Sequence, residues 1–157
     1  MELTDFLKER NISIATAESC TGGMMAKRIT DEAGVSAIFD GGIVTYANRI
    51  KHQYLGVKNE TLATYGAVSA QTAEEMAKGI CAAIGADLGI ATTGIAGPGG
   101  GTDEKPVGTV FVGIYYAPTD TLKILPLHLS GSRDTIRRQT CDAAFREATA
   151  LLKSIRN

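Results

Sequence analysis

The order of apolar and polar residues along the chain shows two periodicities, one typical of helices and one typical of strands. The helical periodicity is clearest over residues 70–84, where apolar side chains recur at spacings of three and four residues and Cys81 lies on the apolar stripe. The same spacing predicts a short first helix around Leu3–Leu7 and a closing helix over 132–155 that carries a packed Cys141. The shorter helices that the pattern predicts are 24–30 and 48–54, the latter capped by Asn48.

Short apolar runs bounded by turn residues lie between these helices and are typical of buried strands. Only the turn at 117–121 separates the last two runs, so we expect them to form a hairpin. Strands that alternate with helices before a hairpin predict an α/β sandwich with a largely parallel sheet and one antiparallel strand. We find no linker and no repeat, which predicts one domain over 1–157. The predicted strands are 12–17, 41–47, 87–93, 107–116 and 122–129.

Charge and cysteine usage narrow the class of partner. The chain has 16 Lys and Arg against 17 Asp and Glu, and this balance argues against nucleic-acid binding and against a membrane surface. It contains neither an apolar run long enough to span a bilayer nor a signal-like segment near Met1. The 3 cysteines form no CxxC pair, which indicates a reducing compartment. We therefore expect a cytoplasmic protein that acts on a small molecule.

Glycine is the one residue type in clear excess. The chain has 18 glycines in 157 residues, above the usual share of ~7%, so we expect them at particular places. In open α/β sheets ligands bind beyond the carboxyl ends of the strands, and the loops that follow strands are where chemistry is expected. Three such loops are rich in polar residues or glycine.

The first of these loops, 16–23, is a polar turn between a buried strand and a helix. Ser19 or Cys20 would project there as a nucleophile, beside backbone N–H groups at the helix N-terminus that favour a developing oxyanion. The structural alternative is that Ser19 and Thr21 only cap the helix.

The second loop leads from the strand at 41–47 to Lys51. A lysine held near a serine in a poorly solvated cleft can lose its proton and act as a general base, and Tyr46 would orient it or relay the proton. The alternative for Lys51 is an ordinary solvated helix residue. His52 is a weaker candidate, because Lys51 competes for the same role and no acidic partner is indicated.

The third loop, 92–107, follows a buried strand and contains a run of glycines. Backbone N–H groups in such a loop can approach a ligand closely, although neither GxGxxG nor GxxxxGK[ST] is present. The alternative is a mobile surface loop, and the glycines also suggest a loop that closes on a bound substrate. The 2 histidines and the scattered cysteines form no metal-ligand cluster, so we expect no metal.

Five ordered motifs span these loops and their surroundings: Thr16-Ala-Glu-Ser-Cys-Thr-Gly-Gly23, Thr45-Tyr46-Ala-Asn48 with Lys51, Gly66-Ala-Val-Ser69, Thr93-Gly-Ile-Ala-Gly-Pro-Gly-Gly100 and Lys105-Pro-Val-Gly-Thr109. Together they resemble the CinA C-terminal domain family, whose best-characterised activity is nicotinamide-nucleotide amidohydrolase. The resemblance covers nearly the whole chain, as far as Gly131–Asp134 and the pair Arg137-Arg138.

The resemblance implies a three-layer α/β/α fold with a mixed, mostly parallel sheet, and a homodimer. It also implies hydrolysis of the carboxamide of nicotinamide mononucleotide to the carboxylate, with release of ammonia and without a cofactor or metal. Joined to the residues above, it gives Ser19 as nucleophile, Lys51 as base and Tyr46 as an assisting group. The expected oxyanion turn is Cys20, Thr21, Gly22 and Gly23. The expected substrate-binding residues are Asn48, Thr93, Gly94, Ala96, Gly97, Gly99, Gly100 and Arg133.

Three alternatives remain open at this point. Within the enzyme class, Cys20 is the rival nucleophile, because a thiol at a helix N-terminus can have a lowered pKa. Arg49 competes with Arg133 for the phosphate of the substrate. Outside the enzyme class, the chain would be a non-catalytic binding or scaffold module in a competence or DNA-damage context.

Overall fold

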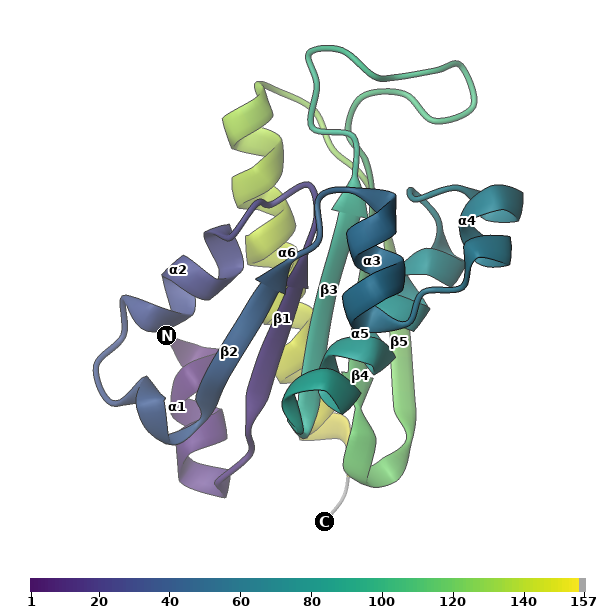
Figure 1. Cartoon of the computed structure of the whole chain (residues 1–157). Helices are drawn as coiled ribbons and strands as arrows, with labels where there is room; N and C mark the ends of the chain where they lie inside the picture. Colours follow the sequence, from purple (N-terminus) through teal and green to yellow (C-terminus); the bar gives the residue numbers. More distant parts are fainter. Residues whose placement is uncertain (156–157) are drawn as a thin grey trace.

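The computed structural model describes residues 1–155 and shows a five-stranded sheet between two layers of helices (Figure 1). Two short 3₁₀ turns, at Val35–Ala37 and Ala117–Thr119, complete the regular structure. In chain order the elements are α1 (Glu2–Arg10), β1 (Ile14–Glu18), α2 (Met24–Thr30), β2 (Phe39–Val44), α3 (Asn48–Leu55), α4 (Asn59–Tyr65), α5 (Ala70–Ile84), β3 (Leu88–Gly94), β4 (Thr109–Tyr116), β5 (Thr121–His128) and α6 (Arg133–Ser154).

The strands lie in the order β2-β1-β3-β4-β5. β1 pairs in parallel with both β2 and β3, whereas β4 is antiparallel to both β3 and β5. Four strands therefore run in one direction and only β4 opposes them. The predicted mixed, mostly parallel sheet with a terminal hairpin is confirmed.

Two apolar clusters fix the helical layers on the sheet. The larger one joins α1, α2 and α6 to one face, with Ile14, Ile90 and Ile136 all but inaccessible to solvent. The smaller one lies under α5 on the opposite face and includes Ala17 and Met76. The predicted three-layer α/β/α arrangement is therefore confirmed.

Several of the surplus glycines allow close packing within this core. Gly89 of β3 and Gly113 of β4 lie directly beneath α5, where an added Cβ would collide with the carbonyl oxygens of Ala77 and Ala73. A Cβ on Gly79 would collide with the carbonyl of Leu55, the last residue of α3. Close backbone approach is one of the recognised reasons for a glycine inside a strand, and here it lets α5 lie close to both the sheet and α3.

Some element boundaries differ from the predictions. The strand expected over 41–47 ends at Val44. The Thr45 N–H makes the last hydrogen bond to β1, to the Glu18 carbonyl, and the chain then turns away from the sheet. Asn48 is the first residue of α3 instead of its cap, and the capping position is Ala47. The pattern also did not predict α4, in which Thr61 is the one buried residue, so no apolar stripe marks it.

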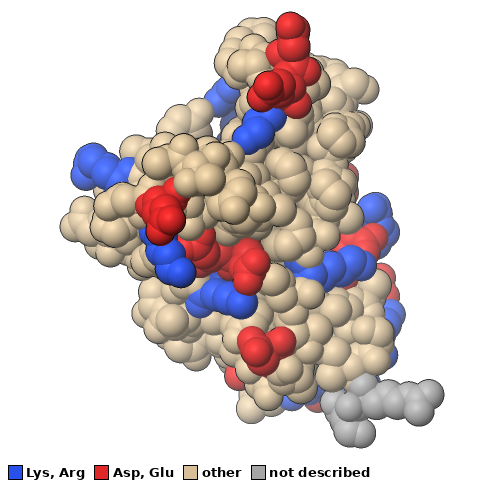
Figure 2. All heavy atoms as spheres, turned by 90° about the vertical axis from the view of Figure 1, so that its right-hand side faces the viewer, with Lys and Arg blue, Asp and Glu red and all other residues tan. Residues whose placement is uncertain are grey.

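The face on the right of Figure 1 carries positive and negative side chains interspersed, with no extended area of one sign (Figure 2). Over residues 1–155, no helix combines the length and the apolar character needed to cross a membrane. The carboxyl ends of β1 and β3 meet the start of α6 at one end of the sheet, below the long loop that joins β3 to β4 (Figure 1). The candidate site lies at this end.

Candidate active site

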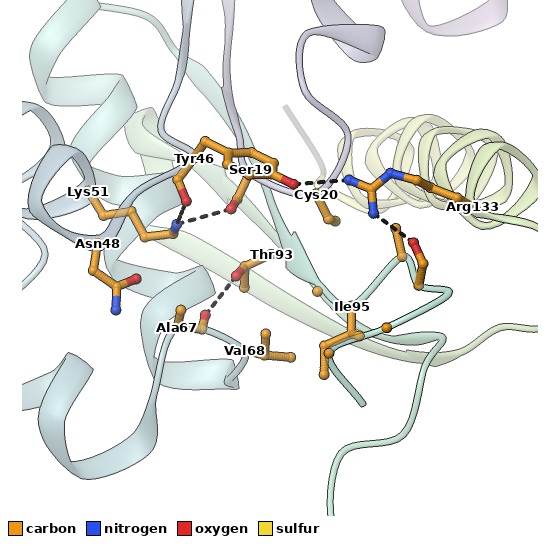
Figure 3. Close-up of a pocket in the computed structure, with 15 residues that line it drawn as sticks. Ser19, Cys20, Tyr46, Asn48, Lys51, Ala67, Val68, Thr93, Ile95 and Arg133 are labelled. Atoms are coloured by element: carbon orange, nitrogen blue, oxygen red, sulfur yellow. Dashed lines mark hydrogen bonds between the residues drawn. The ribbon is translucent and has the colours of Figure 1, made fainter. Parts of the chain in front are cut away.

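A cavity of about 290 Å³ lies at the carboxyl ends of β1 and β3. It draws together residues from five separate segments of the chain, and it lies where ligand sites are expected in open α/β sheets. The expected site residues that line it are Ser19, Cys20, Tyr46, Asn48, Lys51, Thr93, Gly94, Ala96, Gly97, Gly99, Gly100 and Arg133 (Figure 3).

Ser19 and Lys51 form a buried pair inside this cavity. The Lys51 Nζ lies 3.0 Å from the Ser19 Oγ, although 32 positions separate the two residues in the chain. Lys51 is only 1% exposed, and its side chain turns in beneath the start of α3. Its other two partners are the backbone carbonyls of Thr45 at 2.7 Å and Tyr46 at 3.2 Å. All three partners are uncharged.

Burial without a carboxylate partner disfavours the charged form of Lys51, and it lowers the pKa of this lysine from 10.5 to about 8. A neutral amine has two N–H donors and one lone pair. The carbonyls of Thr45 and Tyr46 can only accept, so they take both donors. The lone pair then faces the Ser19 hydroxyl, which must donate its proton toward Lys51. In its neutral form, Lys51 is therefore placed as a base for Ser19.

Tyr46 contacts Lys51 through its backbone and not through its phenol. The side chain is 61% exposed and points toward the start of α6, where its hydroxyl accepts a hydrogen bond from Arg133 Nη2 at 3.0 Å (Figure 3). The chain turns after β2 so that the carbonyls of Thr45 and Tyr46 face α3 and the phenol faces the cavity mouth. Tyr46 was expected to orient Lys51 or relay its proton; its carbonyl contacts the amine, whereas its phenol contacts Arg133 instead.

The structure brings only part of the expected oxyanion turn to the cavity. Thr21, Gly22 and Gly23 do not line the cavity, and the Gly22 N–H already donates to the Ser19 carbonyl at 3.1 Å. The N–H groups at the start of α2 are occupied as well, because the buried carboxylate of Glu18 accepts from them. Cys20 differs from Thr21, Gly22 and Gly23 in that it lines the cavity. Within residues 1–155 its N–H donates to no other residue.

Cys20 is poorly suited to be the nucleophile. Its side chain is 6% exposed, and desolvation raises the pKa of the thiol to about 11. The reactive form of a cysteine is the thiolate, which is a minor species at neutral pH when the pKa is that high. Ser19 is therefore favoured over the neighbouring thiol, since its hydroxyl contacts Lys51 and the pKa of the thiol is raised.

The loop between β3 and β4 forms one wall of the cavity. Its Gly97 carbonyl accepts a hydrogen bond from Arg133 Nη1 at 2.7 Å. A Cβ on Gly97 would lie 2.5 Å from Val107, and one on Gly101 would lie 2.7 Å from the Val107 backbone, so these glycines let the loop fold tightly around Val107. Lys105 Nζ ties the loop to the Tyr65 carbonyl at 2.9 Å. These contacts favour a preformed wall over a mobile surface loop.

Three lining residues were not predicted: Ala67, Val68 and Ile95. The Thr93 hydroxyl donates to the Ala67 carbonyl at 2.7 Å and so holds the connection between α4 and α5 against β3. These side chains bear no reactive group, and their only signal in the sequence was membership in the motifs Gly66–Ser69 and Thr93–Gly100.

The charge of the cavity suits an anion. Lys51 and Arg133 are the charged residues that line it, and no Asp or Glu is among the lining residues. The expected competitor Arg49 does not line the cavity. Within residues 1–155, no group of three or more His, Cys, Asp or Glu side chains is placed to hold a metal ion.

Curated relatives of this chain carry names that refer to competence and DNA damage. The chain is 51% identical over 138 residues to a putative competence-damage inducible protein of Clostridium novyi, a match that covers 88% of this chain and 33% of that protein. It is 49% identical over 137 residues to a CinA-like protein of Kosmotoga olearia, covering 87% of this chain and 33% of the relative. The chain thus spans about a third of the length of these relatives.

Solved structures match over almost the entire chain. The competence/damage inducible protein CihA from Agrobacterium tumefaciens has a TM-score of 0.92 at 41% identity, covering 95% of this chain and 90% of that one. The competence damage-inducible protein A from Klebsiella pneumoniae has a TM-score of 0.94 at 34% identity, covering 99% and 95%. Residues 1–152 match the CinA C-terminal domain. The chain therefore belongs to the CinA C-terminal domain family.

Proposed function

We propose that the chain is an amidohydrolase that converts nicotinamide mononucleotide to nicotinate mononucleotide and ammonia through a serine acyl-enzyme. The observation that carries the proposal is the buried contact of 3.0 Å between Ser19 Oγ and Lys51 Nζ, with the two remaining contacts of the amine made to carbonyls. This arrangement can deprotonate a serine without a histidine or a metal.

In the first half of the reaction, Ser19 Oγ forms a bond to the carboxamide carbon and its proton moves to Lys51 Nζ. Lys51 then gives that proton to the departing nitrogen, which leaves as ammonia when the carbon–nitrogen bond breaks. In the second half, Lys51 takes a proton from water, the resulting hydroxide attacks the acyl carbon, and the ester bond to Ser19 breaks. Ser19 recovers its proton from Lys51, so the chain returns to its starting state.

The oxyanion of each tetrahedral intermediate requires a hydrogen-bond donor that is fixed in advance. The Cys20 N–H is the turn donor that we assign to this role, because its residue lines the cavity directly after Ser19. Loss of one such donor typically costs on the order of 3 kcal/mol of transition-state stabilisation. A backbone donor also explains why the Cys20 side chain need not take part in the reaction.

The rest of the cavity fits the remainder of the proposed substrate. The Arg133 guanidinium donates one hydrogen bond to the Gly97 carbonyl and one to the Tyr46 hydroxyl. Within residues 1–155 it pairs with no carboxylate, so its remaining N–H groups are available to a phosphate. Val68 and Ile95 line the opposite part of the cavity from Lys51 and present apolar surface to a flat ring (Figure 3).

The test is an ammonia assay on the purified chain with nicotinamide mononucleotide, free nicotinamide and the dinucleotide as separate substrates. We expect ammonia from the mononucleotide with the wild-type chain and with Ser36→Ala, whose exposed serine lies outside the cavity, but not with Ser19→Ala. Ammonia release by Ser19→Ala would contradict the proposed mechanism. No ammonia from any of the three substrates would contradict the proposed function and favour a binding or scaffold module.

A further inference from the structure

Glu18 is a buried acidic residue that the proposed reaction does not use. It ends β1 immediately before Ser19 and is only 1% exposed. Its carboxylate accepts three hydrogen bonds: from the Thr21 hydroxyl at 2.7 Å, from the Met25 N–H at 2.8 Å and from the Ala26 N–H at 3.0 Å. The carboxylate thereby satisfies N–H groups at the start of α2 and ties that helix to the turn that carries Ser19.

The Thr21 hydroxyl is the centre of this network. It lies 2.7 Å from the carboxylate of Glu18 and 2.7 Å from the hydroxyl of Thr92 in β3. An ionised carboxylate can only accept, so Thr21 donates its single proton to Glu18. Only lone pairs of Thr21 then face Thr92, so Thr92 must be the donor in that contact. The Thr92 carbonyl also accepts the Ser19 N–H at 3.0 Å, and β3 thus holds the turn at both ends.

The same turn is held from the side of α6. Arg137 Nη2 donates to the Thr21 carbonyl at 2.7 Å, and the guanidinium lies so close to Gly22 that an added Cβ would be 3.0 Å from Nη2. Thr21 is therefore fixed through both its hydroxyl and its carbonyl. Ser19 lies between the two anchored residues Glu18 and Thr21, which leaves its backbone little freedom.

We propose that Thr21 and Glu18 are positioning residues, which hold the Ser19 hydroxyl against Lys51 through the hydrogen-bond network of the turn. This inference rests on the proposed function, because it assumes that Ser19 is the nucleophile. Neither side chain lines the cavity, so neither would touch the substrate. A displacement of about 1 Å at a reacting group can lower the rate on the order of 100-fold, so the network has a measurable consequence for catalysis.

The experiment compares three variants of buried threonines. Thr21→Val keeps the shape of the side chain but removes the hydroxyl, and Thr21→Ser restores the hydroxyl. Thr149→Val is the matched control, because Thr149 is also buried and its hydroxyl donates to the Phe145 carbonyl near the far end of α6. For each variant we would measure kcat and KM for ammonia release, and hydrogen exchange of the peptide 18–26 in the free chain.

We expect Thr21→Val to lower kcat tenfold or more, up to about 100-fold, with KM within about twofold of the wild-type value and faster exchange over 18–26. Thr21→Ser and Thr149→Val should stay near the wild-type values in all three measurements. If Thr21→Val does not fold, Thr92→Val removes the donor to Thr21 and should show the same separation of kcat from KM.

Two results would overturn the inference. The first is unchanged exchange over 18–26 in Thr21→Val, which would show that the network does not fix the turn. The second is faster exchange with an unchanged kcat, which would show that the fixed turn does not position the nucleophile. A wild-type chain that releases no ammonia would contradict the proposed function instead, and the exchange comparison would still decide whether the network holds the turn.

Discussion

Arg133 joins Tyr46 across the mouth of the cavity: its Nη2 donates to the Tyr46 hydroxyl at 3.0 Å while its Nη1 donates to the Gly97 carbonyl at 2.7 Å. The guanidinium thus connects the start of α6, the segment after β2 and the loop after β3. Both acceptors are uncharged, so the positive charge of Arg133 remains available to an anionic substrate.

Arg133→Ala should weaken binding of nicotinamide mononucleotide more than it slows the chemical step. A hydrogen bond to a charged group contributes about 1.5–3 kcal/mol, so we expect KM to rise roughly 10- to 100-fold with kcat changed much less. Steady-state kinetics measure this split. Arg138→Ala is the control, because Arg138 lies on the same helix but pairs with Asp134 at the surface. An equal rise in KM for both variants would contradict a direct role for Arg133.

Loss of the Ser19 side chain should lower kcat strongly, whereas loss of the Cys20 side chain should change kcat little. Ser19→Ala removes the proposed nucleophile, and we expect kcat to fall about 10⁴-fold or more. Cys20→Ala should keep kcat within about tenfold, because burial keeps the thiol protonated and its backbone N–H remains in place. Mass spectrometry of the chain quenched during turnover should show the acyl group on the peptide that contains Ser19. Full activity in Ser19→Ala would instead assign the reaction to another group.

The pH dependence of the reaction should follow Lys51. The free chain needs Lys51 in its neutral form, and the pKa of this amine is lowered to about 8 by burial. We therefore expect kcat/KM for nicotinamide mononucleotide to rise tenfold per pH unit below pH 8 and to level off above it. A profile that is flat between pH 6 and 9 would show that Lys51 is not the base.

The loop after β3 should be ordered before the substrate binds. Val107 fills the space beside Gly97 and Gly101, and Lys105 anchors the loop to Tyr65. We expect slow hydrogen exchange over 95–108 in the free chain and little further slowing with substrate. Lys105→Ala should speed exchange in this loop, whereas Lys58→Ala, at the opposite end of α4 from Tyr65, should not. Strong protection that appears only with substrate would indicate a closing loop.

Much of the fold could be predicted from the sequence because burial left a periodic signal. The helix predicted over 70–84 begins and ends at those residues, since an apolar stripe runs along it and Ser69 caps it with a hydrogen bond to the Thr72 N–H at 3.2 Å. The helix at Asn59–Tyr65 was missed because a single buried residue makes no stripe. Periodicity therefore predicts an element only when that element contributes a face to the core.

The site was predictable only in part, because its geometry depends on contacts between distant segments. The family motifs indicated Ser19 and Lys51, and the cavity contains both. The expected oxyanion donors Thr21, Gly22 and Gly23 lie outside the cavity lining, and the Gly22 N–H donates to the Ser19 carbonyl, which the spacing of residues does not reveal. Ala67 has no functional group, and its place in the wall depends on a hydrogen bond from Thr93, which is distant in the sequence.

Lys51 should also make the stability of the fold depend on pH. Its pKa is lowered in the folded chain, from 10.5 to about 8, so between these values the unfolded chain binds one more proton than the folded chain. Stability rises with pH wherever the unfolded state binds more protons, so the contribution of Lys51 becomes more favourable as pH rises from 8 to 10.5. A shift of this size corresponds to about 3 kcal/mol in total.

The comparison that isolates this effect is wild type against Lys51→Met. Burial raises the pKa of each cysteine, so at high pH the thiols ionise more readily in the unfolded chain than in the folded chain. This lowers the stability of both proteins at high pH, and the effect largely cancels in their difference. The lost hydrogen bonds to Thr45 and Tyr46 lower the stability of the variant by an amount that does not change with pH. Urea unfolding at several pH values measures the free energy of unfolding of both proteins. We expect the value for the wild type, relative to that for Lys51→Met, to rise by about 3 kcal/mol between pH 8 and 10.5. A difference that stays constant over this range would mean that burial does not lower the pKa of Lys51, and the proposed base would lose its physical support.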